Sequence, residues 1–165
     1  MMSIALGGFG IRAQVLGQLA SVMGREYPPC REGLMSMQIV FAGGKRVDAM
    51  YKGFRICTDQ PAEAGGTNQA PSPFDLFLAS LGTCAGYFVL SFCQRRDLPT
   101  EGVSLTLSAV RDASGHRLAR IQIDIVLPED FPAELVAACA RAADQCAVKS
   151  HLAPGLPVEI VARRA

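Results

Sequence analysis

The sequence predicts an α+β fold in one domain, with the element order βββ-α-ββ-α-β. Short runs that alternate apolar and polar residues, separated by glycine-containing turns, indicate strands before residue 60 and after residue 103. Between them, the stretch from Leu76 to Cys93 contains no charged residue, which indicates a long buried helix. Half of the 165 residues are hydrophobic, enough for a core that needs no disulfide bonds.

Residues 1–34 differ in pattern from the rest of the chain. Apolar residues recur there with loose helical spacing until "YPPCREG" breaks the pattern. Two interpretations are open. One is a short helix appended to the domain. The other is that translation begins at Met35 or Met37, because the codons for "REG" just upstream could be a purine-rich ribosome-binding site. We therefore place the domain at residues 35–165 and assign no function to the extension.

The domain begins with a predicted meander of three strands. "MQIVFAGG", "KRVDAMYKG" and "FRICTDQ" are short runs separated by Gly-Gly and Lys-Gly turns. "PAEAGGTNQAPSP" then reads as a loop, because it is rich in residues that favour turns.

The long helix has recognisable start and stop signals. Ser72 is a good N-cap, Pro73 suits the first helical position, and Asp75 completes a capping box. At the other end Arg95 and Arg96 suit the negative end of the helix dipole, and a proline follows in "RRDLP".

The uncharged stretch also meets the minimum length of a membrane span, about 17 residues. Its small and polar residues, among them two cysteines, argue against a span, as do the half-polar strands on either side that need a helix to cover them. We expect a helix buried inside one subunit or between two. Gly82 and Gly86 favour the second, because small residues let another backbone approach closely.

After the helix, "VSLTLSAVRD" and "HRLARIQIDIVLPED" alternate apolar and polar residues and predict a hairpin joined at "ASGH". "FPAELVAACARAADQCAV" predicts a single second helix, and "GLPVEIVARRA" a last strand. The second helix is predicted from apolar residues that recur at about the helical period, namely Leu135, Cys139, Ala142 and Cys146.

Composition excludes some classes of function. Sixteen basic residues against fifteen acidic ones leave no excess of positive charge that would bind nucleic acid or an anionic membrane, and the chain has no tryptophan. The six cysteines form no C-x-x-C pair, so we expect neither a metal site nor a bound cofactor. Without a recognisable signal peptide, the expected location is the reducing cytoplasm, with mostly free thiols.

Cys84 is the first candidate for chemistry. It shares a helical stripe with Phe77, Leu81 and Phe88, which we take as candidate binding residues around the thiol. A lone cysteine on an apolar helix is more often core than nucleophile, so both interpretations remain open on the residues alone.

The pair of motifs "SPFDLFLASLGTCAGY" and "ADQCAVKSHL" resembles the OsmC/Ohr family of osmotically inducible and organic-hydroperoxide-resistance proteins. The resemblance covers roughly residues 35–165 and implies an intertwined homodimer around a long central helix, with two sites at the subunit interface. It further implies that Cys84 is the peroxidatic cysteine and Cys146 the resolving one. An organic hydroperoxide would be the substrate and a dithiol, of lipoyl type in the family, the reductant.

The resemblance also implies a cation that activates the thiol, because a thiol in an apolar pocket is otherwise poorly reactive. The family uses an arginine from the first strand connection, and Arg46 occupies that place in "GGKRVDA". In typical members a glutamate orients this arginine, but here Phe74 stands at that position. Glu63 could substitute only if its loop folds inward, and His151 is a further candidate for lowering a thiol pKa.

Two hypotheses follow. The first is a thiol-dependent hydroperoxide reductase in oxidative-stress defence, which cycles through a cysteine sulfenic acid and a disulfide. The alternative is a catalytically weak member of the family that binds a small apolar or electrophilic molecule at the same site. The cysteine pair favours the first, and the missing glutamate favours the second.

Overall fold

The computed structural model describes residues 36–152 and 157–164. Contacts divide the chain into Met1–Gln38 and Ile39–Ala165, and the elements below belong to the second unit apart from the first residue of β1. Both interpretations of residues 1–34, a short helix and a later translation start, concern a segment that lies outside the described residues.

The first three strands form a sheet with the order β1-β2-β3, as predicted. The strands span Gln38–Gly43, Arg46–Tyr51 and Phe54–Ile56. β2 and β3 pair antiparallel with Met50 opposite Arg55, around a turn in which Lys52 and Gly53 both have positive φ. Such a turn matches the twist of the strands it joins and so fixes their register.

A loop with one turn of 3₁₀ helix, Ala62–Ala64, leads from β3 to the long helix. The carboxylate of Asp59 organises this loop: it accepts hydrogen bonds from the backbone N–H groups of Gln60, Thr67 and Gln69 and from the Thr67 hydroxyl. The Thr67 hydroxyl and these N–H groups outweigh burial and lower the pKa of Asp59 to about 2.

Helix α2 spans Pro73–Gln94 and confirms the predicted long helix. Ser72 is its N-cap, and the side chains and backbones of Ser72 and Asp75 form the reciprocal bonds of a capping box. At the C-terminal end, the guanidinium groups of Arg95 and Arg96 donate to the carbonyls of Ser91 and Phe92. Local signals in the sequence therefore set both ends of the helix.

Replacing Ser72 with alanine is expected to lower the free energy of unfolding by about 1 kcal/mol, because the N–H of Asp75 loses its acceptor. Thermal unfolding followed by circular dichroism measures the change. Ser72→Asp, which restores a capping oxygen, should recover most of the loss; an equally destabilised aspartate variant would contradict the capping role.

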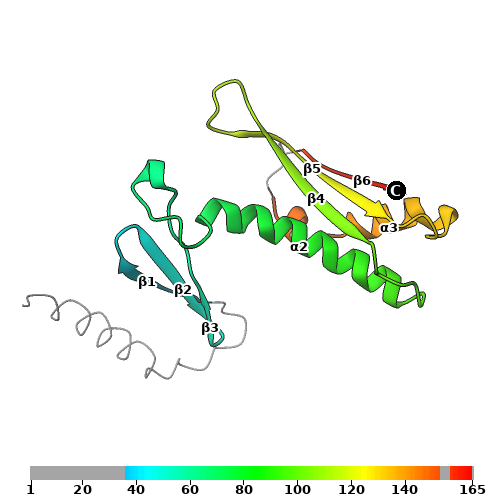
Figure 1. The fold of residues 1–165 in the computed structure, drawn as a ribbon, viewed down its shortest axis with the longest axis horizontal. Helices are drawn as coiled ribbons and strands as arrows, with labels where there is room; N and C mark the ends of the chain where they lie inside the picture. Colours follow the sequence, from blue (N-terminus) through cyan, green and yellow to red (C-terminus); the bar gives the residue numbers. More distant parts are fainter. Residues whose placement is uncertain (1–35, 153–156, 165) are drawn as a thin grey trace, which may run out of the picture. The chain divides into compact units, whose positions relative to one another are not determined.

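A second sheet follows α2, with the order β4-β5-β6 (Figure 1). The predicted hairpin consists of β4, Ser104–Arg111, and β5, Leu118–Leu127, and the last strand, β6, Val158–Arg164, pairs parallel with β5. Alternate side chains of β5 are buried, as expected for a strand with one face covered. α2 contacts β4 and α3, and α3 contacts β6, so the two helices cover this sheet. The core residues between these layers include Leu81, Ala85, Val89, Ile121, Ile123, Ile125, Leu127 and Cys139.

The predicted single second helix is wrong in one respect. The segment forms a 3₁₀ turn at Ala133–Leu135, helix α3 at Val136–Ala143 and a separate single turn, α4, at Ala147–Ser150. Cys146 separates them: its backbone is extended (φ −50°, ψ 115°), and its thiol accepts a hydrogen bond from the N–H of Lys149. Cys146 therefore caps α4 and does not continue the face of Cys139.

Candidate functional site

The structure brings Cys84 and Cys146 together. Cys84 lies on α2 and is partly buried, whereas Cys146 is buried and precedes α4. Each thiol affects the pKa of the other, and the Cys146 Sγ donates to the carbonyl oxygen of Leu81, about one turn before Cys84 on α2, at 3.9 Å. Both cysteines are free, so the arrangement is that of a reduced dithiol.

The surroundings of the two thiols differ, and so do their pKa values. Burial raises the pKa of Cys84, but hydrogen bonds from the Val148 N–H, the Cys146 thiol and the Ala147 N–H together hold it below its ordinary value. Burial raises the pKa of Cys146, and the bond that it makes to Cys84 raises it further. Cys84 is therefore the thiol that ionises first, and Cys146 is a proton donor beside it.

The backbone donors come from α4, whose position depends on the turn before it. The N–H of Cys146 donates to the carbonyl of Ala143, which closes the last turn of the preceding segment. An ion pair between Lys149 and Asp144 spans the turn. Sequence reasoning found Cys146 but missed the donors at Ala147 and Val148, because backbone groups leave no signature in residue type.

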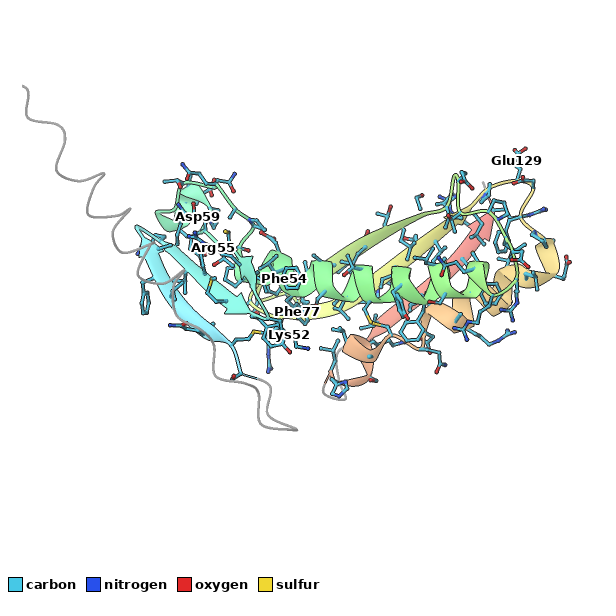
Figure 2. The ribbon with its side chains drawn as sticks, turned by 90° about the horizontal axis from the view of Figure 1, so that it is seen from below. Lys52, Phe54, Arg55, Asp59, Phe77 and Glu129 are labelled. Carbon is cyan, nitrogen blue, oxygen red and sulfur yellow. The ribbon has the colours of Figure 1, made fainter. Side chains whose placement is uncertain are left out.

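Arg46 lies on β2, beside the buried carboxylate of Asp48. Its Nη2 is 4.0 Å from Asp48 Oδ2, whereas Arg55 donates to the same oxygen from Nε at 2.8 Å and from Nη2 at 2.6 Å. Figure 2 labels Arg55 on the first sheet. The N–H of Thr58 donates to the other carboxylate oxygen at 3.2 Å. Within the described chain, the Arg46 Nε is buried and has no hydrogen-bond partner.

Asp48 is thus shared by two guanidinium groups, of which Arg55 is the closer. Asp48 and Arg55 were not among the candidates from the sequence. The strand register could have indicated them, since a tight Lys52–Gly53 turn places Met50 opposite Arg55 and Asp48 on the same face. No hydrogen bond or ion pair joins Arg46 to Cys84 in the part of the chain that the structure describes.

The three candidate binding residues lie in different environments. Leu81 is completely buried in the core, Phe77 is partly buried against it, and Phe88 lies outside the core cluster and makes an edge-to-face contact with Tyr87. A cavity of about 490 Å³ lies on another side of α2, where Gly82 faces Leu107 of β4. Its apolar lining consists mainly of Leu78, Ala79, Gly82, Leu105, Leu107 and Ile123.

Four further residues named from the sequence make no hydrogen bond or ion pair to either thiol in the described part of the chain. Phe74 is partly exposed, with the Arg111 guanidinium 5.2 Å from its ring centroid, and Asp75 is engaged in the capping box. Glu63 is exposed in the 3₁₀ turn of the loop. The Nδ1 of His151 lies 2.7 Å from the carbonyl oxygen of Ala147.

Two wider features bear on the site. In residues 36–152 and 157–164, no group of three or more histidine, cysteine or acidic side chains could hold a metal ion. Helix α2 is long and apolar enough by composition to cross a membrane. Here it packs through its buried stripe on β4 and α3, as a core helix does.

Comparison with known proteins places this geometry in a family. The sequence model of the OsmC family, described as OsmC-like protein, matches residues 66–161. A search of curated proteins found none that matches the chain.

Solved structures share the fold. An OsmC-like protein from Mycoplasma pneumoniae is 11% identical with a TM-score of 0.65, covering 82% of this chain and 99% of its own. An organic hydroperoxide resistance protein OsmC from Legionella pneumophila is 15% identical with a TM-score of 0.56, covering 81% and 98%. An organic hydroperoxide resistance protein from Elizabethkingia anophelis is 15% identical with a TM-score of 0.59, covering 82% and 100%. Because the family model matches more than half of this chain, the chain belongs to the OsmC family.

Proposed function

We propose that the protein is a thiol-dependent hydroperoxide reductase with Cys84 as the nucleophile and Cys146 as the resolving thiol. The observation that carries this proposal is the unequal dithiol. Although burial opposes it, the Val148 N–H, the Cys146 thiol and the Ala147 N–H lower the pKa of Cys84. Burial raises the pKa of Cys146, whose Sγ donates to the Leu81 carbonyl on the same helix as Cys84. The organic hydroperoxide resistance proteins among the structural neighbours support a role in oxidative-stress defence.

The proposed cycle begins with the Cys84 thiolate. Its sulfur attacks the terminal oxygen of the hydroperoxide, an S–O bond forms, the O–O bond breaks, and the alcohol leaves with a proton. Cys146, the neighbouring acid, is positioned to supply that proton. The Cys146 sulfur, now a thiolate, then attacks the sulfenic acid of Cys84: an S–S bond forms, the S–O bond breaks, and the departing hydroxide takes a proton from solvent to become water.

A dithiol restores the reduced enzyme by two exchange steps and is itself oxidised to a disulfide. We infer a dithiol, because two linked thiols complete the exchange without a third reactant. The lipoyl type is what the resemblance to the OsmC/Ohr family implies. Cys84 and Phe77 both pack against the hydrophobic core, and these apolar surroundings favour organic hydroperoxides as substrates. A reducing compartment, the cytoplasm, would keep both cysteines available.

Arg46 is the proposed cation of the site. Asp48 lies near it at 4.0 Å but is already bonded twice by Arg55, so the charge of Arg46 is only partly neutralised. A guanidinium in this state can stabilise a thiolate and orient a peroxide oxygen.

The proposed assembly is a homodimer. Large apolar side chains are exposed on α2 and on the first sheet, among them Phe41 at 89%, Phe54 at 71% and Tyr87 at 62%. Exposed apolar surface of this kind is typical of a protein interface. Light scattering coupled to size-exclusion chromatography should give twice the mass of the chain.

The proposed function is tested by a stoichiometric pulse of cumene hydroperoxide on the reduced protein, followed by non-reducing intact-mass and peptide analysis. We expect rapid loss of two hydrogens per chain, mapped to a Cys84–Cys146 disulfide. Slow oxidation, or oxidation at other cysteines with Cys84 intact, would refute the proposal.

A second candidate function is binding of a small apolar or electrophilic molecule at the same site, with little turnover. The observation that favours it is Phe74, whose ring lies beside Arg111 where the resemblance leads one to expect an orienting glutamate. Ligand affinity that persists in Cys84→Ser and Cys146→Ser would support this function over peroxide reduction.

A further inference from the structure

Two arginines on the first sheet lie beside one buried carboxylate. Arg46, Asp48 and Met50 alternate along β2 and so share one face of the strand. Arg55 of β3 lies directly opposite Met50, which places it on the same face. Asp48 is completely buried, whereas the Arg46 and Arg55 side chains are 33% and 36% exposed. The two guanidinium groups are therefore almost equally accessible and have the same acceptor beside them.

Arg55 is the arginine that binds this acceptor. The Oδ2 atom of Asp48 accepts hydrogen bonds from Arg55 Nε at 2.8 Å and from Arg55 Nη2 at 2.6 Å. The Oδ1 atom accepts a hydrogen bond from the N–H of Thr58 at 3.2 Å. The hydrogen bond to Asp48 raises the pKa of Arg55 above its ordinary value. Both oxygens of the carboxylate therefore have partners other than Arg46.

Arg46 makes no such bond to the carboxylate. Its Nη2 is 4.0 Å from Asp48 Oδ2, which is beyond hydrogen-bond distance. Among the residues that the structure describes, its buried Nε–H has no acceptor, and a buried donor without an acceptor is costly. Two guanidinium groups and one carboxylate leave one positive charge, and the side chain of the neighbouring Lys45 lies beside Gly65 of the next loop. Arg46 thus combines an unused donor with a charge that Asp48 does not balance.

We propose that Arg46 is a binding site for small carboxylates and that Arg55 is the positioning residue that keeps Arg46 unpaired. A guanidinium presents its N–H groups in a planar fork that matches the two oxygens of a carboxylate. One excess positive charge suits a monoanion of this kind. The inference goes beyond the proposed function, because a carboxylate would bind here whether or not Cys84 reacts with a peroxide.

Arg55 matters because Asp48 would otherwise bind Arg46. A buried carboxylate without a partner is costly, so Asp48 needs one of the two arginines. Without Arg55, a small rotation of the Arg46 side chain would close the 4.0 Å gap to Asp48. The fork of Arg46 would then be used inside the protein. Arg55 therefore controls whether Arg46 is available, without touching the ligand.

The test is the labelling of individual arginines by phenylglyoxal in the full-length reduced protein, quantified on proteolytic peptides by mass spectrometry. Phenylglyoxal reacts with the deprotonated guanidinium, so an arginine bound to a carboxylate reacts more slowly. Because the two side chains are almost equally exposed, accessibility does not explain a difference between them. Arg46 should be labelled about tenfold faster than Arg55, as expected for one hydrogen bond to a charged group.

Sodium benzoate should slow the labelling of Arg46 in a saturable manner. Benzamide, which has the same ring without the charge, should not slow it when the ionic strength is held constant. Arg120 is the matched internal control, since it lies 3.6 Å from Glu159 on the second sheet. Neither compound should change the labelling of Arg120.

Variants of Arg55 test its positioning role. Arg55→Gln should slow the labelling of Arg46 about tenfold and remove the protection by benzoate, because Asp48 then binds Arg46. Arg55→Lys keeps a cation for Asp48 and should leave Arg46 as reactive as in the unmodified protein. The double variant Asp48→Asn with Arg55→Gln removes the competing carboxylate as well, so Arg46 should again be labelled rapidly. Circular dichroism checks the fold of each variant.

Equal labelling of Arg46 and Arg55, or equal protection by benzamide, would overturn the inference. So would rapid labelling of Arg46 in a folded Arg55→Gln protein; if that variant does not fold, slow labelling in the double variant has the same meaning. The proposed function fails separately, because cumene hydroperoxide carries no carboxylate. A chain that binds benzoate at Arg46 but does not reduce cumene hydroperoxide has this site without the proposed activity.

Discussion

Replacing Cys84 with serine is expected to lower the rate of peroxide reduction by a factor on the order of 10³ or more. A serine hydroxyl keeps the size and place of the side chain, but it is not ionised at neutral pH and forms no stable S–O intermediate. The backbone donors at Ala147 and Val148 would then face a neutral oxygen. Stopped-flow loss of cumene hydroperoxide, with and without a dithiol, measures the change.

Cys146→Ser separates the two steps of the cycle. The first attack should still occur, because the backbone N–H groups of Val148 and Ala147 that lower the pKa of Cys84 remain, but the sulfenic acid has no resolving thiol and should accumulate. Trapping with dimedone and mass analysis of the Cys84 peptide detect it. Cys57→Ser, which removes an exposed thiol, is the control and should behave as the unmodified protein.

Full turnover in Cys84→Ser would assign the chemistry to another thiol.

Short-range signals predicted the limits of α2. The cap at Ser72 and the closing arginines act within one turn of the residues they satisfy, so reading the sequence locally was sufficient. The Lys52–Gly53 turn predicted a hairpin for the same reason, since its positive φ angles are a property of two residues.

The break before α4 could not be predicted in this way. "AADQCAV" carries no proline or glycine, and a thiol is not among the usual capping groups. The break depends on Cys146. Its sulfur donates to the Leu81 carbonyl, and its pKa is affected by Cys84. Both of these residues are remote from Cys146 in the sequence. Tertiary contacts with α2 therefore end the helix here, overriding the helical period.

For the candidate site, the roles of Cys84 and Cys146 stay predictions. Quoted motifs located both thiols, and each thiol affects the pKa of the other. Helical spacing could not distinguish Leu81 from Cys84, because both lie on one apolar stripe. The packing of α2 separates them: Leu81 is completely buried, while Cys84 remains partly accessible beside α4.

Leu81→Ala is accordingly expected to act on stability. Removing a completely buried leucine side chain loses its transfer free energy and leaves a cavity that close-packed neighbours fill only in part. The free energy of unfolding should fall by about 3 kcal/mol. Urea denaturation followed by circular dichroism, at a fixed protein concentration, measures it.

Leu76→Ala is the matched control, since it makes the same chemical change on the same helix at a partly buried position outside the core cluster. It should cost about 1 kcal/mol or less. The contrary result is a Leu81→Ala protein that unfolds at the same urea concentration but discriminates differently between bulky and small hydroperoxides. That outcome would mean that Leu81 lines the substrate pocket, as its place on the stripe with Cys84 first indicated. If the protein loses stability but still discriminates between hydroperoxides as before, Leu81 contributes to packing. The chemistry then begins with Cys84 on this stripe.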